Sequence, residues 1–170
     1  DLVGLLVDTV ADARAAGPDH DWQLDLAVLE PPADATPEEA EDFLPEPPLV
    51  IGDEARLRQV VVNLLANARV HTPAGSHVTT TLAREGDTLI VRIHDDGPGI
   101  APEVRDRLFE RFARGDSSRE RRTGSTGLGM SIALAIVQSH GGSIDVASST
   151  APEDHGTTFS VRLPAAVVEE

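Results

Sequence analysis

The sequence contains no cysteine, no lysine and no tyrosine, and aromatic residues make up only 3% of its 170 residues. Without cysteine the chain cannot form disulfides or thiolate metal sites. We expect neither a membrane span nor a signal peptide in it, because no apolar run approaches the roughly 20 residues that a span needs. With 40% hydrophobic residues, the chain is long enough for one domain with a core of valine, leucine, isoleucine and alanine.

The charge is unevenly distributed. A net charge of −15 argues against nucleic acid as a partner, because a phosphate backbone needs a basic surface. All 14 basic residues are arginine, and seven of them fall between 105 and 122, whereas none lies between Arg14 and Arg56. A solvated face is the ordinary interpretation of any one arginine. A cluster of this density in an acidic chain favours a local anion-binding site.

The hydrophobic periodicity predicts an α/β fold. Helices are expected over 1–16, 53–70, 102–112 and 128–140, and strands over 22–29, 49–51, 77–83 and 88–94 and in the closing sequences "SIDVAS" and "TTFSVRL". Asp53 is the expected N-cap of the second helix. The acidic, proline-rich stretch 30–48 is expected to be a solvated, partly mobile insertion. Together these elements predict a two-layer α/β sandwich, with a mixed, mainly antiparallel sheet covered on one face by about three helices.

Two asparagines stand out in the helix predicted over 53–70. Asn63 and Asn67 are four residues apart, so they share one face of an otherwise apolar helix. A buried amide without a hydrogen-bond partner costs about 1–3 kcal/mol, and asparagine is an indifferent helix former. A pair of them in a core helix therefore indicates either local hydrogen bonding or a ligand.

Two glycine-rich stretches also depart from core chemistry. Asp95, Gly97 and Gly99 form a D-x-G-x-G sequence after a predicted strand, in which a carboxylate can accept from an amino group while glycines let the backbone approach a flat ring. "TGSTGLGMSI", 123–132, runs directly into a helix, whose N-terminus suits phosphate. Each signal alone is weak, and neither a Walker loop nor a Rossmann fingerprint is present.

The order of these stretches resembles the catalytic ATP-binding domain of bacterial two-component sensor histidine kinases (HATPase), in the GHKL superfamily shared with DNA gyrase, Hsp90 and MutL. The corresponding motifs are "RLRQVVVNLLANARVHTP" (N box), "DDGPGI" (first glycine box), "LFERFARGDSSR" (F box), "GSTGLGM" (second glycine box) and "HGGSIDVAS…GTTFSVRLP" (closing segment). The resemblance implies a Bergerat-type fold. It also implies that 1–20 is a lead-in helix from a missing dimerisation domain and that 21–166 is the ATP-binding domain.

The resemblance assigns roles to the three stretches. Asn67 is expected to bind Mg²⁺ through its amide oxygen, with Asn63 beside it near the metal and the phosphates. Asp95 is expected to accept from the exocyclic amino group of adenine, against which Gly97 and Gly99 let the chain lie. Thr158 is expected to help through a water molecule.

The arginine-rich stretch and the second glycine box are expected to hold the phosphates. Residues 113–126 resemble the flexible lid over the nucleotide, anchored by Phe109 and Phe112, with Arg111 or Arg114 at the γ-phosphate. The residues expected along the phosphate chain are Gly124, Thr126, Gly127, Leu128 and Gly129. Family members often carry lysine at Val70, and we expect that contact to be lost here, because Arg69 lies on a different face of the helix.

The activity implied is transfer of the γ-phosphoryl of Mg-ATP to a histidine on a separate dimerisation domain. None of the six histidines lies in the H-E-x-x-T/N-P context of an acceptor. The partners implied are that domain and a response regulator, in a homodimer whose catalytic part is cytoplasmic and belongs to an inner-membrane sensor. The alternatives are a GHKL-type ATPase and an anti-sigma-type serine kinase. The ATPase is disfavoured because such ATPases carry glutamate at the position of Asn63. The F box and the arginine-rich lid favour the histidine kinase over the serine kinase.

Overall fold

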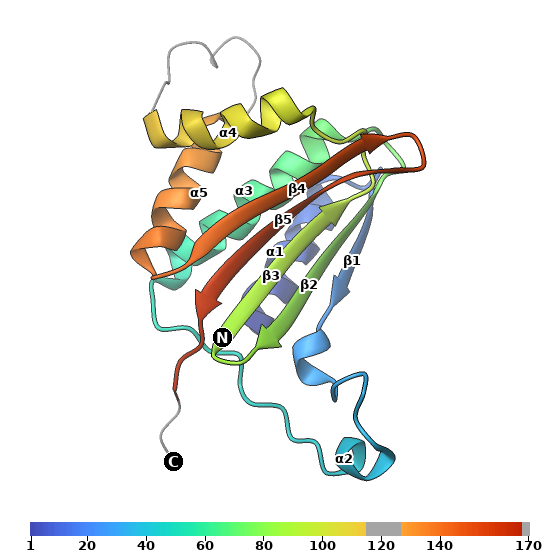
Figure 1. The fold of residues 1–170 in the computed structure, drawn as a ribbon, viewed down its shortest axis with the longest axis vertical. Coiled ribbons are helices and arrows are strands. Elements are labelled where there is room, and N and C mark those ends of the chain that lie inside the picture. Colours follow the sequence, from blue (N-terminus) through green and yellow to red (C-terminus); the bar gives the residue numbers. More distant parts are fainter. Residues whose placement is uncertain (115–126, 168–170) are drawn as a thin grey trace.

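The computed structural model describes residues 1–114 and 127–167. Its elements follow one another along the chain as coloured in Figure 1. They are α1 (Leu2–Ala16), β1 (Asp21–Asp25), the 3₁₀ turn η1 (Ala27–Leu29), α2 (Pro37–Glu41), α3 (Glu54–His71), β2 (His77–Glu85), β3 (Thr88–Asp95), α4 (Pro102–Arg114), α5 (Gly127–Ser139), β4 (Ser143–Ala151) and β5 (Asp154–Pro164).

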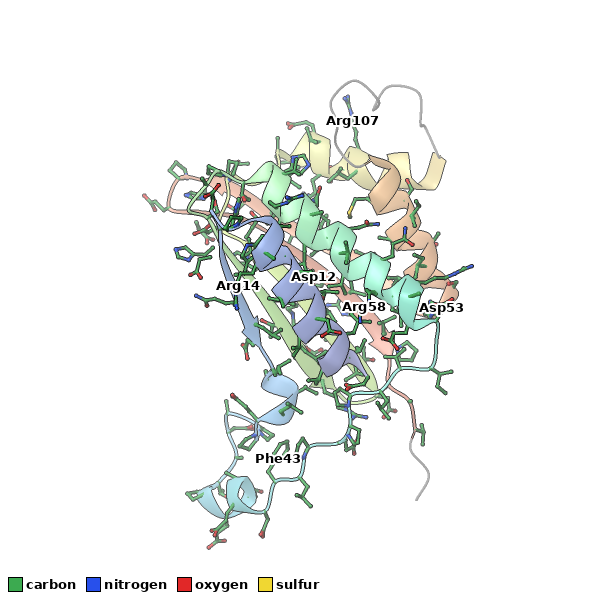
Figure 2. All side chains as sticks on the ribbon, turned by 180° about the vertical axis from the view of Figure 1, so that it is seen from behind. Asp12, Arg14, Phe43, Asp53, Arg58 and Arg107 are labelled. Carbon is green, nitrogen blue, oxygen red and sulfur yellow. The ribbon has the colours of Figure 1, made fainter. Side chains whose placement is uncertain are left out.

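The sheet is mixed and mainly antiparallel. Its strands lie in the order β1-β2-β3-β5-β4; β1 runs parallel to β2, and the other three pairs are antiparallel. Helices α1 and α3 cover one face and α5 packs beside α3, as the opposite views of Figures 1 and 2 show. The predicted two-layer α/β sandwich is confirmed.

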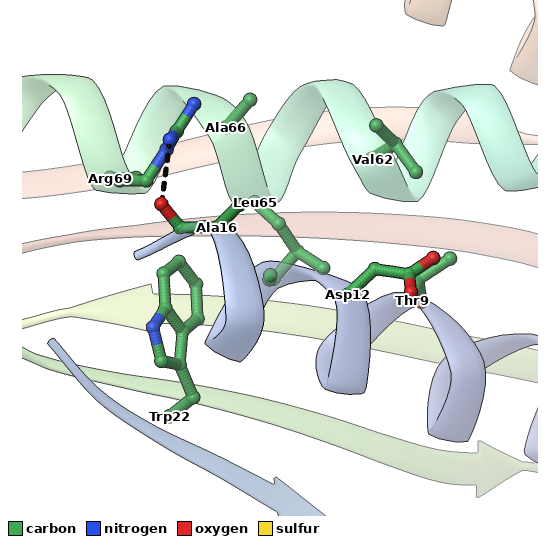
Figure 3. A pocket seen from close by; sticks show the side chains of 9 residues that line it. Thr9, Asp12, Ala16, Trp22, Val62, Leu65, Ala66 and Arg69 are labelled. Carbon is green, nitrogen blue, oxygen red and sulfur yellow. Dashed lines mark hydrogen bonds between the residues drawn. The ribbon is translucent and has the colours of Figure 1, made fainter. Parts of the chain in front are cut away.

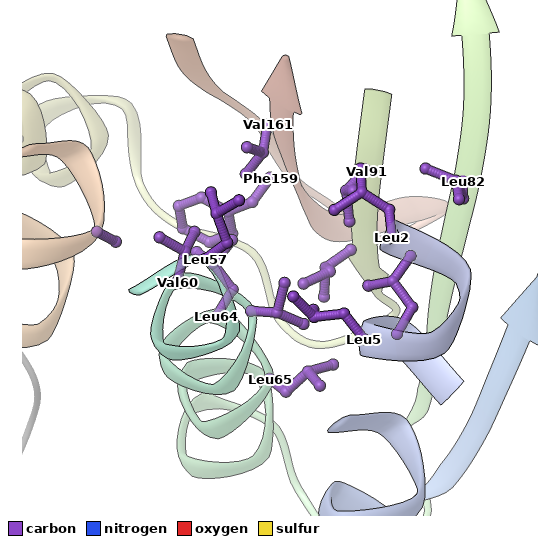
Figure 4. Close-up of a cluster of buried hydrophobic side chains, with 14 of the residues drawn as sticks. Leu2, Leu5, Leu57, Val60, Leu64, Leu65, Leu82, Val91, Phe159 and Val161 are labelled. Atoms are coloured by element: carbon purple, nitrogen blue, oxygen red, sulfur yellow. The ribbon is translucent and has the colours of Figure 1, made fainter. Parts of the chain in front are cut away.

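The hydrophobic core lies between the sheet and this helical layer (Figure 4). Alternate residues of the central strand β3 (Leu89, Val91 and Ile93) point towards the helices, as the period of two in a strand requires. Helices α1 and α3 meet them with rows of leucine and valine. Burying each such side chain stabilises the fold by about 1.5–3 kcal/mol. Helix α1 is thus part of the same hydrophobic core as the sheet.

Two strand predictions need correction. No strand forms at 49–51: the Leu49 carbonyl accepts the Ala166 N–H at 2.7 Å, but the Leu49 N–H turns back to the Pro47 carbonyl at 2.9 Å, and Ile51 stays 83% exposed. The strand expected over 22–29 ends at Asp25, because the chain then turns through η1 to bury Val28. Short apolar runs fit either structure, so their pattern did not distinguish a strand from a packed turn.

The insertion 30–48 is solvated, as predicted, but it also contains the short helix α2, none of whose residues is buried. Thr36 and Glu39 form a reciprocal capping box: the Glu39 N–H donates to the Thr36 hydroxyl at 3.3 Å, and the Thr36 N–H donates to the Glu39 carboxylate at 2.7 Å. An ion pair of 2.7 Å between Glu46 and Arg84 joins the insertion to β2. The T-x-x-E spacing was the sequence signal for this helix.

The start of α3 is joined to the end of α5. The carboxylate of Asp53 accepts the Arg56 N–H at 3.1 Å, which confirms the predicted N-cap. The N–H of Asp53 itself donates to His140 Nε2 at 3.0 Å, while His140 Nδ1 donates to the Ile136 carbonyl at 2.7 Å. These two bonds fix the ring as the neutral Nδ1–H tautomer and tie the two helices together.

Replacing His140 by alanine should therefore destabilise the fold. Loss of both hydrogen bonds, with the Asp53 N–H left to water, should lower the free energy of unfolding by about 1–2 kcal/mol. Urea denaturation followed by circular dichroism measures it. Gln138→Ala, an exposed change two residues earlier in the last turn of α5, is the control. An equal effect of both variants would show that the His140 bridge adds nothing.

Candidate functional site

One face of α3 connects the two glycine-rich regions. Asn63 and Asn67 are both half-buried on it, one helical turn apart. The Asn63 Nδ2 donates to the carbonyl of Gly129, in the first turn of α5, at 3.1 Å. Just beyond the C-terminal end of α3, Thr72 packs so closely on the first glycine box that a Cβ at Gly97 would lie 2.5 Å from its methyl carbon. Asn67 thus lies between the two contacts.

Asp95 is a buried carboxylate at the end of the central strand. Only 7% of it is exposed, and its Oδ1 accepts the Gly97 N–H at 3.0 Å. Burial raises the pKa of Asp95 above its usual value, while the bond from Gly97 opposes that shift. Its alternation with Leu89, Val91 and Ile93 places the side chain on the helix-covered face of the sheet. A buried acceptor in this position is suited to an amino group of a ligand.

The loop after Asp95 needs glycine for a steric reason. Gly99 has φ of +79°, and a Cβ there would lie 2.0 Å from the backbone oxygen of Ser149. That contact is backbone against backbone, so no side-chain movement could relieve it. The D-x-G-x-G pattern therefore reflects close packing of this loop on β4.

The hairpin β4–β5 also holds the loop by hydrogen bonds. His155 Nδ1 donates to the Gly97 carbonyl at 2.8 Å, and the Ile100 N–H donates to Ser148 Oγ at 2.7 Å. Ser148 Oγ lies 3.0 Å from the Gly156 carbonyl and 2.8 Å from Thr157 Oγ1. Sequence reasoning missed Ser148 and His155, because nothing in the local pattern distinguishes them from surface residues of a hairpin.

The two threonines of the "GTTF" sequence lie on opposite faces of the sheet. Thr158 pairs with His94 in the ladder and its hydroxyl bonds His94 Nδ1 at 2.9 Å, on the sheet face opposite to Asp95. Thr157 pairs with Asp95 itself and is 5% exposed. The alternation of the apolar residues Phe159 and Val161 with polar ones was the signal that assigns Thr157 to the inner face.

The remaining predicted residues are only partly described. Gly127 and Leu128 begin α5, and Gly129 lies in its first turn against Asn63, where a Cβ would be 3.6 Å from the Asn63 side chain. Gly124, Thr126 and most of the predicted lid 113–126 lie outside the described residues. Arg111 and Arg114 belong to α4, and their side chains, like those of Phe109 and Phe112, are not among those described.

Arg69 is directed away from these groups. Its Nη1 donates to the Ala16 carbonyl of α1 at 3.1 Å, and it lines a cavity of about 160 Å³ between α1 and α3 (Figure 3). Val70, where family members often carry lysine, is 52% exposed. Arg69 thus contacts α1 rather than the glycine-rich regions, and the loss of the lysine contact to phosphate stays a prediction.

In 1–114 and 127–167, no helix is long and apolar enough to cross a membrane. Over the same ranges, no group of three or more histidine, cysteine, aspartate or glutamate side chains could hold a metal ion.

A five-stranded mixed sheet, helices on one face and a glycine loop after the central strand define a two-layer α/β sandwich. The sequence matches the family described as histidine kinase-, DNA gyrase B-, and HSP90-like ATPase over residues 52–167. The probable sensor histidine kinase TcrY of Mycobacterium tuberculosis (strain ATCC 25618 / H37Rv) is 48% identical over 164 residues, or 96% of this chain and 30% of TcrY.

Solved structures agree. The mycobacterial sensor histidine kinase MprB gives a TM-score of 0.73 at 28% identity, covering 99% of this chain and 98% of that one. Full-length ShkA in complex with AMPPNP gives 0.69 at 26% identity, covering 100% of this chain and 31% of ShkA. The chain belongs to the histidine kinase-, DNA gyrase B- and HSP90-like ATPases, a membership that implies ATP binding. It spans about 30% of the length of TcrY.

Proposed function

We propose that this chain is the nucleotide-binding part of a sensor histidine kinase, which binds Mg-ATP and presents its γ-phosphoryl to a histidine on a separate domain. The observation that carries the proposal is the α3 face, where Asn63 meets the start of α5 and Thr72 meets the glycine loop beside Asp95. A nucleotide lying along this face would have its base at Asp95 and its phosphates at α5. The ShkA structure, with AMPPNP bound, supports an ATP-shaped ligand.

The base would be recognised by Asp95 and Thr157. With one carboxylate oxygen accepting the Gly97 N–H, the second is available to accept from the 6-amino group of adenine. Gly97 and Gly99 let the loop pack closely on Thr72 and Ser149, and the ring would lie against the loop held in this position. Thr157, in place of Thr158, is the threonine on the same sheet face.

Magnesium fits the residues present. Mg²⁺ prefers oxygen ligands and keeps several waters, so it needs few protein groups when a nucleotide supplies phosphate oxygens. The bond to Gly129 uses the amide nitrogen of Asn63, and an amide binds a cation through its oxygen. Asn67, on the same face one turn on, would provide an amide oxygen to the metal. When bound, the metal would neutralise phosphate charge during transfer.

The phosphate chain would lie at the N-terminus of α5, where backbone N–H groups favour an anion. We assign Gly124, Thr126, Gly127, Leu128 and Gly129 to this role and 113–126 to a lid. Arg111 and Arg114 are proposed to contact the γ-phosphate. The N-terminus of α5 and the two arginines would place positive charge where the phosphates bind, in a chain whose net charge is −15.

The rest of the signalling cycle is likewise proposed. The acceptor histidine would lie on a dimerisation domain to which α1, within 1–20, leads. Residues 21–166 would form the catalytic domain, and α1 would pack into its core. The phosphoryl group would then pass to a response regulator. The full-length protein would be a homodimer and an inner-membrane sensor with this domain in the cytoplasm, as the resemblance implies.

A GHKL-type ATPase is the first alternative, and Asn63 separates it from a kinase. An amide cannot take a proton from water, so a site with asparagine in place of glutamate lacks that general base. An anti-sigma-type serine kinase would share the nucleotide site and differ in its acceptor residue.

We therefore expect this chain to bind ADP and ATP with Mg²⁺ in the roughly micromolar to millimolar range yet to hydrolyse ATP very slowly. Calorimetry measures binding, and a phosphate-release assay measures turnover. Chelating the metal should weaken ATP binding because the phosphates lose their counter-charge. Absence of ATP binding would contradict the proposal, and brisk phosphate release by this chain alone would favour the ATPase.

A further inference from the structure

Ser148 sits at the junction of the glycine loop and the strand that carries Thr157. Its hydroxyl has three partners: the Ile100 N–H at 2.7 Å, the Gly156 carbonyl at 3.0 Å and the Thr157 hydroxyl at 2.8 Å. It is half-buried, and Gly156 and Thr157 are buried, so water does not readily replace these bonds. The three contacts together determine where each proton lies.

The directions of these three hydrogen bonds follow from the single proton of the Ser148 hydroxyl. Serine has one proton to donate and two lone pairs with which to accept. The Ile100 N–H can only donate, so it uses one lone pair, and the Gly156 carbonyl can only accept, so it takes the Ser148 proton. The Thr157 hydroxyl must then donate to the second lone pair of Ser148. Any other assignment leaves two acceptors facing each other at 3.0 Å.

We infer that Ser148 is a specificity-determining positioning residue, which fixes Thr157 as a hydrogen-bond acceptor towards the bound base. Once the proton of Thr157 points to Ser148, only its lone pairs remain for a ligand or a bridging water. Beside the carboxylate of Asp95, the inner face then offers acceptors only. These acceptors can accept hydrogen bonds from the 6-amino group of adenine. The 6-oxo group of guanine or hypoxanthine would face them as one acceptor against another. The inference rests on the proposed nucleotide site.

Ser148→Ala should change selectivity as well as affinity. Without Ser148, the Thr157 hydroxyl can rotate and donate to a 6-oxo group, while it no longer holds the orientation that favours adenine. We expect ADP affinity to fall about tenfold and IDP affinity to stay level or rise, so that the ADP-to-IDP affinity ratio falls. ADP and IDP share ribose and phosphates and differ only at the base. Titration calorimetry with Mg²⁺ measures both.

Ser160→Ala is the matched control, because Ser160 lies on the opposite face of β5; it should leave the ratio unchanged. Ser148→Thr, which keeps the hydroxyl, should restore it. An equal loss for both nucleotides would show a merely structural role for Ser148, and no change in either would likewise overturn the inference. Failure of the unsubstituted chain to bind ADP would instead contradict the proposed function itself.

Discussion

Asp95→Asn is expected to weaken ADP binding by about a hundredfold or more while leaving the fold intact. The Gly97 N–H would keep the amide oxygen where the carboxylate oxygen now lies, at 3.0 Å. The second position would then hold an NH₂ group facing the 6-amino group of adenine, donor against donor. Loss of a charged hydrogen bond and its replacement by a repulsive contact together account for a change of this size.

Asp96→Asn makes the same chemical change one residue along the chain. Asp96 accepts the His77 N–H at 2.8 Å and does not face the helical layer, because side chains alternate here. Calorimetric titration of ADP into both variants would isolate the carboxylate of Asp95. Equal affinity of Asp95→Asn and the unsubstituted chain would remove Asp95 from adenine recognition.

Asp95→Asn should not lower the free energy of unfolding in the absence of nucleotide. Burial raises the pKa of Asp95 in the folded state, so the folded chain holds this proton more tightly than the unfolded chain. Its contribution to the free energy of unfolding therefore falls as the pH rises from the unfolded pKa through the raised folded pKa. Above the raised folded pKa, the ionised group is a net cost to stability, which asparagine removes. Such a cost is expected where a group is placed for a ligand.

The long elements and their order could be predicted from the sequence because periodicity is a strong signal over many residues. α3 combines a capping aspartate, Asp53, with apolar residues on one side, and its boundaries were predicted to within a residue. Residues 49–51 were wrongly predicted as a strand, since three apolar residues carry no period. The pairing partner that would make them a strand is a property of the whole fold.

The residues of the candidate site also divide into those that a local sequence pattern indicates and those that only the fold reveals. Asp95 and the two asparagines were predicted as site residues because an unusual residue type in an apolar context is visible locally. The choice between Thr157 and Thr158 depends on register, which places one on each face of the sheet. Ser148 could not be identified at all, because its three partners are 8, 9 and 48 residues away in the sequence.

Transfer of the γ-phosphoryl group to a histidine is the second large effect and the central claim. The acceptor histidine is proposed to lie on a separate domain, so this chain alone should not incorporate radioactive phosphate from ATP. Mixed with the dimerisation domain of its own full-length protein, it should label that domain. The phosphoadduct should be acid-labile and base-stable, as phosphohistidine is and phosphoserine is not.

Asn67 should contribute to the rate of this transfer. Phosphoryl transfer depends on positioning and on charge stabilisation, to which a correctly placed metal contributes several kcal/mol. Asn67→Asp changes both the ligand and the local charge, and should slow labelling by about tenfold or more. Gln59→Ala, an exposed change two turns earlier on α3, should not slow it.

The most direct test is one time course that follows label in the dimerisation domain and free phosphate in the same reaction. Our account predicts label on histidine of that domain, little phosphate release by this chain alone, and slower labelling with Asn67→Asp. Brisk phosphate release with no labelled domain would make the chain an ATPase, and base-labile label on serine would make it a serine kinase. Either result would contradict a histidine kinase.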